Sequence, residues 1–299
     1  ASDTVGVTVA SPTTASAARV LNLSTRGQAL TGAQVLIPGF VIGGTTGTKK
    51  MLLRVVGPTL AGFNVAGTLV DPLLQLKRLD PTTGAYVDVA ANDTWGSAAN
   101  LAALTSATTA VGAFPLTAQS ADAALLVDLA PGSYTALASG VNAGVGVALV
   151  ELYDADGAQP ATRLVNLASR GYVGTGANVL IAGFVVSSEG SRTLLVRAVG
   201  PTLQNFGVAG ALADPLLQVF GRPGGATMDQ LLVSSDNWSA EAGATVTATA
   251  ATQAGAFALP SGSKDAALVI TLPPGAYTVH ASGVGSTEGV ALLEVYALP

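Results

Sequence analysis

Charged residues that recur in the two halves of the sequence are the first candidates for chemistry in this chain. Seven positions keep their charge when the halves are aligned: Arg19/Arg163, Arg26/Arg170, Arg54/Arg197, Asp71/Asp214, Asp93/Asp236, Asp122/Asp265 and Glu151/Glu294. Two carboxylates held close together could perform general acid and base catalysis. However, Arg54 and Glu151 each lie inside an apolar run, where an unpaired charge would be costly to bury. The sequence therefore favours structural ion pairs, or arginine contacts to loop carbonyls, at Arg54, Glu151, Arg197 and Glu294.

Other catalytic arrangements lack the residues that they need. The chain has one histidine, His280, and no cysteine, and the position equivalent to His280 in the first half is Leu137. A serine–histidine–aspartate triad is therefore excluded from the first half, and no histidine–cysteine cluster can bind zinc. Asp71, Asn92 and Asp93 could supply oxygens to calcium, but no run of alternating aspartates gathers the about six to eight oxygens needed. The sequence predicts a protein that is not an enzyme and that holds no cofactor and no metal.

One tryptophan occurs in each half, two residues after an aspartate: Asp93-Thr-Trp95 and Asp236-Asn-Trp238. An aromatic ring beside aspartate and asparagine could stack on a sugar, so Trp95 and Trp238 are candidates for glycan contact. The alternative is a loop in which aspartate caps a turn and tryptophan covers the edge of the core. We favour the loop, because a sugar platform usually needs more polar partners than one tryptophan per half provides.

The elements that position these residues belong to an internal repeat. RVLNLSTRGQALTGAQVLIPGFVI (19–42) matches RLVNLASRGYVGTGANVLIAGFVV (163–186), and DAALLVDLAPGSYTALASG (122–140) matches DAALVITLPPGAYTVHASG (265–283). The match divides the chain into an N-terminal arm and linker (1–18), a first unit (19–154), a second linker (155–162) and a second unit (163–299).

The sequence of each unit predicts mainly short strands. Stretches such as VLIPGFVI, AALLVDL and GVALVELYD are rich in aliphatic and β-branched residues and are bounded by Gly, Pro, Asp or Asn. This pattern predicts an all-β protein made of two tandem β-sandwich (jelly-roll-like) domains with an extended N-terminal arm. Alanine and leucine spacing in residues 97–114 would permit one short helix. The pattern leaves open whether the units form separate sandwiches or share a sheet.

Several motifs in the two units resemble those of a repeat found in large secreted and surface-associated proteins of environmental bacteria. The motifs are LIPGFVI/LIAGFVV, RVVGPTL/RAVGPTL, DPLLQ, Asp-x-Trp, PGSYT/PGAYT and ALVELY/ALLEVY, and the resemblance covers nearly the whole chain after residue 18. The resemblance implies a β-rich module that is exported from a bacterial cell, and it implies no known chemistry.

Composition limits the partners of the 299-residue chain. Only 10% of its residues are charged, the net charge is −5, and the 13 lysines and arginines are scattered, so we expect no binding to nucleic acid. No run of 18 apolar residues occurs, so we expect no transmembrane segment. Few charges, few aromatics and no cysteine favour an extracellular or cell-surface location over a cytosolic one.

The first residues of the chain form a short alternating pattern that stands outside the repeat. Val5, Val7 and Val9 would share one face of an extended strand that also contains Thr4 and Thr8. Such an arm could fold back on the first unit, be the remnant of a preceding repeat, or pair with another subunit by strand addition. The arm precedes the first unit as the last strand of the first unit precedes the second, which favours addition to a neighbouring molecule.

We therefore expect a structural subunit of an extracellular bacterial filament, a homopolymer assembled head to tail by its N-terminal arm. The likeness to pilus subunits joined by donor strands is one of mechanism. The alternative is a secreted adhesive or carbohydrate-binding module that does not polymerise and that contacts cell-surface or matrix glycans. Concentration-dependent polymers would favour the first function, and saturable glycan binding by dispersed particles would favour the second.

Overall fold

The described part of the chain is built almost entirely of antiparallel strands. A computed structural model describes residues 18–156, 161–222 and 226–298. Sixteen strands in this part are connected by antiparallel pairing, which confirms the predicted all-β class. The arm residues predicted to form a subunit interface lie outside the described residues: Thr4, Val5, Val7, Thr8 and Val9.

The strands follow the same order in both units. In the first unit they are β1 (Val20–Ala29), β2 (Ile37–Gly44), β3 (Lys49–Val56), β4 (Pro72–Leu79), β5 (Tyr86–Asn92), β6 (Ala123–Leu129), β7 (Gly132–Gly140) and β8 (Gly146–Asp154). In the second unit they are β9 (Thr162–Val173), β10 (Leu180–Val186), β11 (Arg192–Val199), β12 (Pro215–Gly221), β13 (Gln230–Ser235), β14 (Ala266–Leu272), β15 (Gly275–Gly283) and β16 (Gly289–Ala297).

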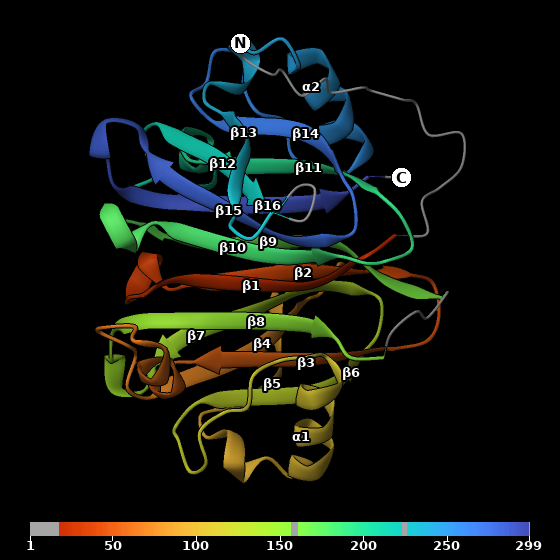
Figure 1. Ribbon diagram of the computed structural model, residues 1–299, viewed down its shortest axis with the longest axis vertical. Coiled ribbons are helices and arrows are strands. Elements are labelled where there is room, and N and C mark those ends of the chain that lie inside the picture. Colours follow the sequence, from red (N-terminus) through yellow and green to blue (C-terminus); the bar gives the residue numbers. More distant parts are fainter. Residues whose placement is uncertain (1–17, 157–160, 223–225, 299) are drawn as a thin grey trace.

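Each unit also has one α-helix and several short 3-10 helices. The α-helices are α1 (Leu101–Ala110) and α2 (Ala244–Gln253), so the helix predicted within residues 97–114 is present. The 3-10 helices are η1 (Gly32–Gln34), η2 (Pro58–Phe63), η3 (Trp95–Ser97), η4 (Val141–Ala143), η5 (Gly176–Asn178), η6 (Pro201–Phe206), η8 (Trp238–Ala240) and η9 (Val284–Ser286). Figure 1 shows α1 and α2 at opposite ends of the long axis.

The two units exchange strand partners, which decides the question that the sequence left open. β1 pairs with β8 of its own unit and with β10 of the other, and β9 pairs with β16 of its own unit and with β2 of the other. Two strand series result: β6-β3-β8-β1-β10-β15-β12-β13 and β14-β11-β16-β9-β2-β7-β4-β5. Each series contains strands of both units, so the units share hydrogen-bonded sheets (Figure 1). The jelly-roll-like sandwich within each unit stays a prediction.

One hydrophobic core accompanies this shared pairing. Side chains alternate along the strands, and the inward set of both units belongs to a single cluster. Leu36 and Leu180, both fully buried, lie where β1 and β9 approach each other. A Cβ on Gly27 would be 3.1 Å from Leu180 Cδ1, and one on Gly171 would be 2.9 Å from Leu36 Cδ1. The glycine in each first strand therefore makes room for a leucine of the other unit.

The outer face of each unit is covered at one end and open at the other. In the first unit α1 supplies Leu104 to a second cluster, which covers Leu52 and Val56 on the outer face of β3. The outer faces of β1, β2, β9 and β10 lie away from both α-helices. These middle strands are where a surface shared by the two units can form.

Candidate functional site

The first charged residues that the sequence singled out form buried ion pairs. Arg54 Nε and Nη2 donate to Glu151 Oε2 at 2.8 and 2.5 Å, and Arg197 donates to Glu294 Oε2 in the same way and at the same distances. Arg54 and Arg197 have no exposed surface. In both units the arginine lies on the third strand and the glutamate on the last, directly opposite each other in register.

The remaining atoms of these pairs are also bonded. Arg54 Nη1 donates to the carbonyl of Phe114 at 2.6 Å, and its guanidinium lies 4.6 Å from the centre of the Phe114 ring. Tyr153 donates its hydroxyl to Glu151 Oε1 at 2.6 Å, and burial beside this carboxylate raises the pKa of Tyr153. Both predicted contacts, to a carboxylate and to a loop carbonyl, are therefore present, and the carboxylate is engaged by arginine and tyrosine.

A second buried carboxylate in each unit has a role that the sequence reasoning did not assign. Asp122 is fully buried and accepts from the Gly57 amide at 2.8 Å and from the Thr59 hydroxyl. These donors lie at the start of η2, whose free amides need acceptors. Asp265 does the same for η6 through Gly200 and Thr202. Proline at the first helical position in both GPTL motifs was a signal for such a helix start.

The two tryptophans are fixed to loops. Trp95 Nε1 donates to the Thr117 carbonyl at 3.2 Å, and Trp238 Nε1 donates to the Pro260 carbonyl at 3.2 Å. Trp238 is only 9% exposed. This burial argues against the glycan contact considered for Trp238, because little of its side chain is exposed to solvent. Trp95 packs against the cluster beneath α1 and takes the core-edge role that we favoured.

A groove among the described residues crosses the boundary between the units. It has a volume of about 640 Å³ and lies over the neighbouring strands β16, β9, β2, β7 and β4. The first two strands belong to the second unit and the other three to the first. With about 4.8 Å between strands, this groove is about 19 Å across. It exists because the units share a sheet.

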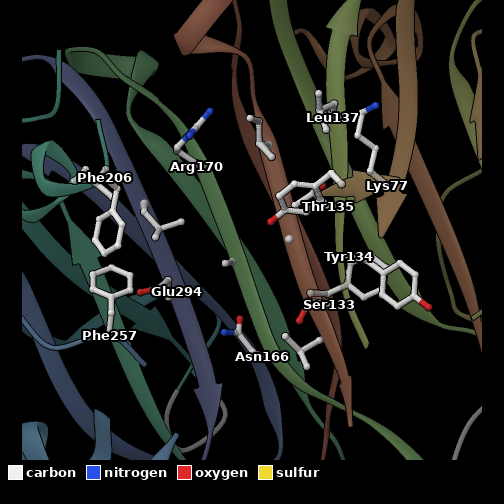
Figure 2. Close-up of a pocket in the computed structure, with 18 of the residues that line it drawn as sticks. Lys77, Ser133, Tyr134, Thr135, Leu137, Asn166, Arg170, Phe206, Phe257 and Glu294 are labelled. Atoms are coloured by element: carbon white, nitrogen blue, oxygen red, sulfur yellow. The ribbon is translucent and has the colours of Figure 1, made fainter. Parts of the chain in front are cut away.

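Aromatic and long side chains flank the groove (Figure 2). Phe206 and Phe257 lie on one side with their ring centres 4.9 Å apart, and Phe206 is 60% exposed. Lys77 and Tyr86, the latter 52% exposed, line the opposite side. The floor between them is low because it includes the small residues Ala168 and Gly39. An extended ligand could therefore lie between two aromatic borders.

Two polar atoms in the groove lack a partner. Arg170 Nε and Asn166 Oδ1 are buried, and neither has a hydrogen-bond partner in the described part of the chain. Both residues lie on β9, four positions apart and on the same face, and both line the groove. A buried donor and a buried acceptor without partners are costly for the fold. A ligand that satisfied them would recover that cost.

The equivalent surface on the other strand series differs at several positions, including Ser24 in place of Ala168. Phe220 replaces Lys77 and His280 replaces Leu137, and the two rings are in contact with their centres 4.6 Å apart. Burial and the nearby Arg26 lower the pKa of His280, and Asp229 partly opposes them. Sequence reasoning noticed the difference at His280 but did not find the groove, because the groove depends on strand exchange.

The described residues show neither a metal-binding cluster nor a membrane-spanning helix. Within residues 18–156, 161–222 and 226–298, no three histidine, aspartate or glutamate side chains gather as metal ligands would. Asn92, considered for calcium, accepts from the Ala124 amide and donates to the Thr94 carbonyl. No helix in the described part is long and apolar enough to cross a membrane.

Comparisons with known proteins give no family for this chain. No protein-family model matches it, and neither does any curated protein sequence. Among solved structures, it is weakly similar to a DUF4785 family protein from Legionella pneumophila, with 10% identity and a TM-score of 0.22 over 97% of this chain and 89% of that one. Similarity at this level carries no information about fold or function, so the function has to be argued from the residues themselves.

Proposed function

We propose that this protein is a non-enzymatic structural subunit of an extracellular bacterial filament, in which the N-terminal arm of one molecule adds to a sheet edge of the next. The observation that supports the proposal best is the state of edge strand β5. This strand pairs only with β4 among the described strands. Val87 and Val89 on it are 54% and 43% exposed. An exposed apolar edge strand is a template for pairing with another chain.

The arm has the complementary properties. In an extended arm, Val5, Val7 and Val9 would lie on one face, and we propose that its backbone pairs with β5. Burying three valines would contribute about 1.5–3 kcal/mol each before the cost of ordering the arm. Head-to-tail addition of this kind does not close on itself and so produces a filament. Extracellular location follows here from composition and from the resemblance to secreted repeats.

Pairs of variants can test both halves of the contact. Val7→Asp would disable the donor arm, and Val89→Lys would disable the acceptor edge. We expect the wild-type chain to form filaments in electron micrographs and each variant alone to stay monomeric. A mixture of the two should form one-to-one dimers in analytical ultracentrifugation, because Val7→Asp keeps a working acceptor and Val89→Lys a working donor.

A matched control is available at edge strand β13. Leu231 on β13 is 50% exposed, and β13 pairs only with β12 among the described strands. Leu231→Lys should therefore leave the filaments intact. If Leu231→Lys abolished them and Val89→Lys did not, β5 would be the wrong acceptor. Dispersed particles from the wild-type chain at every concentration would refute assembly altogether.

A second function is favoured by a separate observation. The groove over β16, β9, β2, β7 and β4 offers aromatic borders and unpartnered polar atoms, which are features of a carbohydrate-binding surface. We therefore propose glycan binding as the second candidate, in a subunit or in a module that does not polymerise. Saturable binding of a glycan by the full chain, with no change in its assembly, would test it.

A further inference from the structure

We infer that the groove over β16, β9, β2, β7 and β4 binds a polysaccharide that carries carboxylates, with Arg170 as the residue that selects the negative charge. This inference rests on glycan binding, the second candidate function above, and is independent of assembly. It follows from the charges in the groove, from the spacing of its unpartnered atoms and from the strands that form its floor.

The charged side chains that line the groove are Glu294, Lys77 and Arg170, and only Arg170 has no ion-pair partner among the described residues. Glu294 is neutralised by Arg197, which donates to it through two nitrogens. Lys77 is paired with Asp88. Arg170 forms no ion pair among the described residues, and its Nε has no hydrogen-bond partner. In a protein with a net charge of −5, this groove therefore presents one local positive charge that a carboxylate could meet.

The surroundings of Arg170 strengthen such a contact. Its neighbours in register are Leu292 on β16 and Ile37 on β2, and both are apolar. A guanidinium between aliphatic side chains is less hydrated than one on an open surface, so a carboxylate bound there would be less screened by water and salt. Arginine also offers two parallel donors, which match the two oxygens of a carboxylate.

The second unpartnered atom in the groove would be satisfied only by a long ligand that also meets Arg170, and its counterpart Asn22 Oδ1 on the other strand series is likewise unpartnered. Asn166 Oδ1 needs a donor, such as a hydroxyl. Asn166 and Arg170 are four residues apart on one strand, which separates their backbones by about 13 Å. A small anion could reach only one of them, whereas an extended chain with carboxylates and hydroxyls could reach both. The exposed rings of Phe206 and Tyr86 can pack against the apolar faces of sugar rings at the two borders.

The strands in the floor argue against an acidic peptide. β9, β2 and β7 are interior strands, each paired on both sides. Their backbone groups are already used in the sheet, so a peptide lying on them would have no strand edge to join. Its own amides and carbonyls would lose water without gaining partners. A sugar chain has no such backbone and forms its hydrogen bonds through hydroxyls.

The experiment measures binding of a defined oligogalacturonate to the full chain by isothermal titration calorimetry. A neutral cello-oligosaccharide and a poly-glutamate peptide of similar length are compared under the same conditions. We expect the uronate to bind at least tenfold more tightly than either, with an affinity that falls as salt is raised. Arg170→Ala should weaken uronate binding at least tenfold, and Arg170→Lys, which keeps the charge but not the paired donors, should restore part of it.

Arg26→Ala is the matched control, because Arg26 holds the equivalent position on the other strand series, beside the Phe220 and His280 rings. We expect it to change uronate affinity less than twofold. Equal losses in Arg26→Ala and Arg170→Ala would overturn the assignment of the site. If the neutral glycan bound and Arg170→Ala left its affinity unchanged, selection of charge would be refuted and glycan binding would stand. If neither sugar bound, both glycan binding and selection of charge would be refuted. If the peptide bound more tightly than the uronate, the ligand of the groove would be an acidic protein and the polysaccharide proposal would be wrong.

Discussion

The outer faces of the two strand series share their buried polar groups but differ in other side chains. Both carry a buried arginine–glutamate pair, a pair of phenylalanine rings beside it and an arginine on the first strand of a unit, Arg26 or Arg170. One face has Lys77 and Leu137 where the other has Phe220 and His280 in ring contact. The first of these faces contains the groove.

This difference shows which parts of a duplicated fold are free to diverge. Buried polar groups depend on one another, because loss of one partner leaves the other buried and uncompensated. Arg197, Glu294 and Tyr296 therefore repeat the contacts of Arg54, Glu151 and Tyr153 with nearly identical distances. Side chains on an outer face depend less on their neighbours. They can change in one unit alone and so give one molecule two different surfaces.

Removing the glutamate from either buried pair should cause the largest loss of stability, and it tests a feature that the two faces share. Glu151→Ala and Glu294→Ala should each lower the free energy of unfolding by about 3–5 kcal/mol, because each leaves an arginine buried without its counter-ion. Urea denaturation of the two variants measures the loss. Since the two pairs have the same geometry, we expect the two losses to agree within about 1 kcal/mol. A clear inequality would show that the halves are not energetically equivalent.

Exchanging the ring pair between the two faces should change which of them binds the ligand. The double variant Lys77→Phe, Leu137→His places the ring pair on the groove face, and Phe220→Lys, His280→Leu removes it from the other. We expect the first to abolish uronate binding and the second to raise the stoichiometry from one to two sites per chain, as measured by calorimetry. Both should unfold within about 1.5 kcal/mol of the wild type, because outer-face changes disturb no buried pair. Unchanged binding in the first variant would separate the ligand from this groove.

The smallest expected effect is the contribution of His280 to the pH dependence of stability. Burial and Arg26 lower its pKa in the folded state. The unfolded chain, in which the pKa of histidine is about 6.5, then binds more protons than the folded chain as the pH falls through that value. His280 therefore contributes stability above its ordinary pKa that is lost as the pH falls below it. His280→Leu should lose less stability than the wild type between pH 7.5 and 5.5, as measured by the urea midpoint. Identical slopes for the two proteins would contradict this assignment.

Local patterns in the sequence were enough to predict the class of fold and its buried arginine–glutamate pairs. Short aliphatic runs between turn residues indicated strands, and the spacing of alanine and leucine indicated the helix in residues 97–114. Arg54 and Glu151 were expected to be paired because each lies in an apolar run, and the structure places them in contact. Trp238 was considered for glycan contact, and its burial argues against that. A ring's exposure depends on which loops cover it, which no local pattern records.

The sequence by itself determined the duplication, the strand-rich character of both units and the need for internal charge pairing, because periodicity and the cost of burying charge are local properties of the chain. Only the tertiary structure decided that β1 pairs with β10 and β9 with β2. The first strands of the two units have a similar pattern of apolar and polar residues, so the pairing of a first strand with its own unit or with the other unit satisfies the same hydrophobic pattern. The choice between them depends on how both units pack together. The groove, which lies over strands of both units, is a product of that choice.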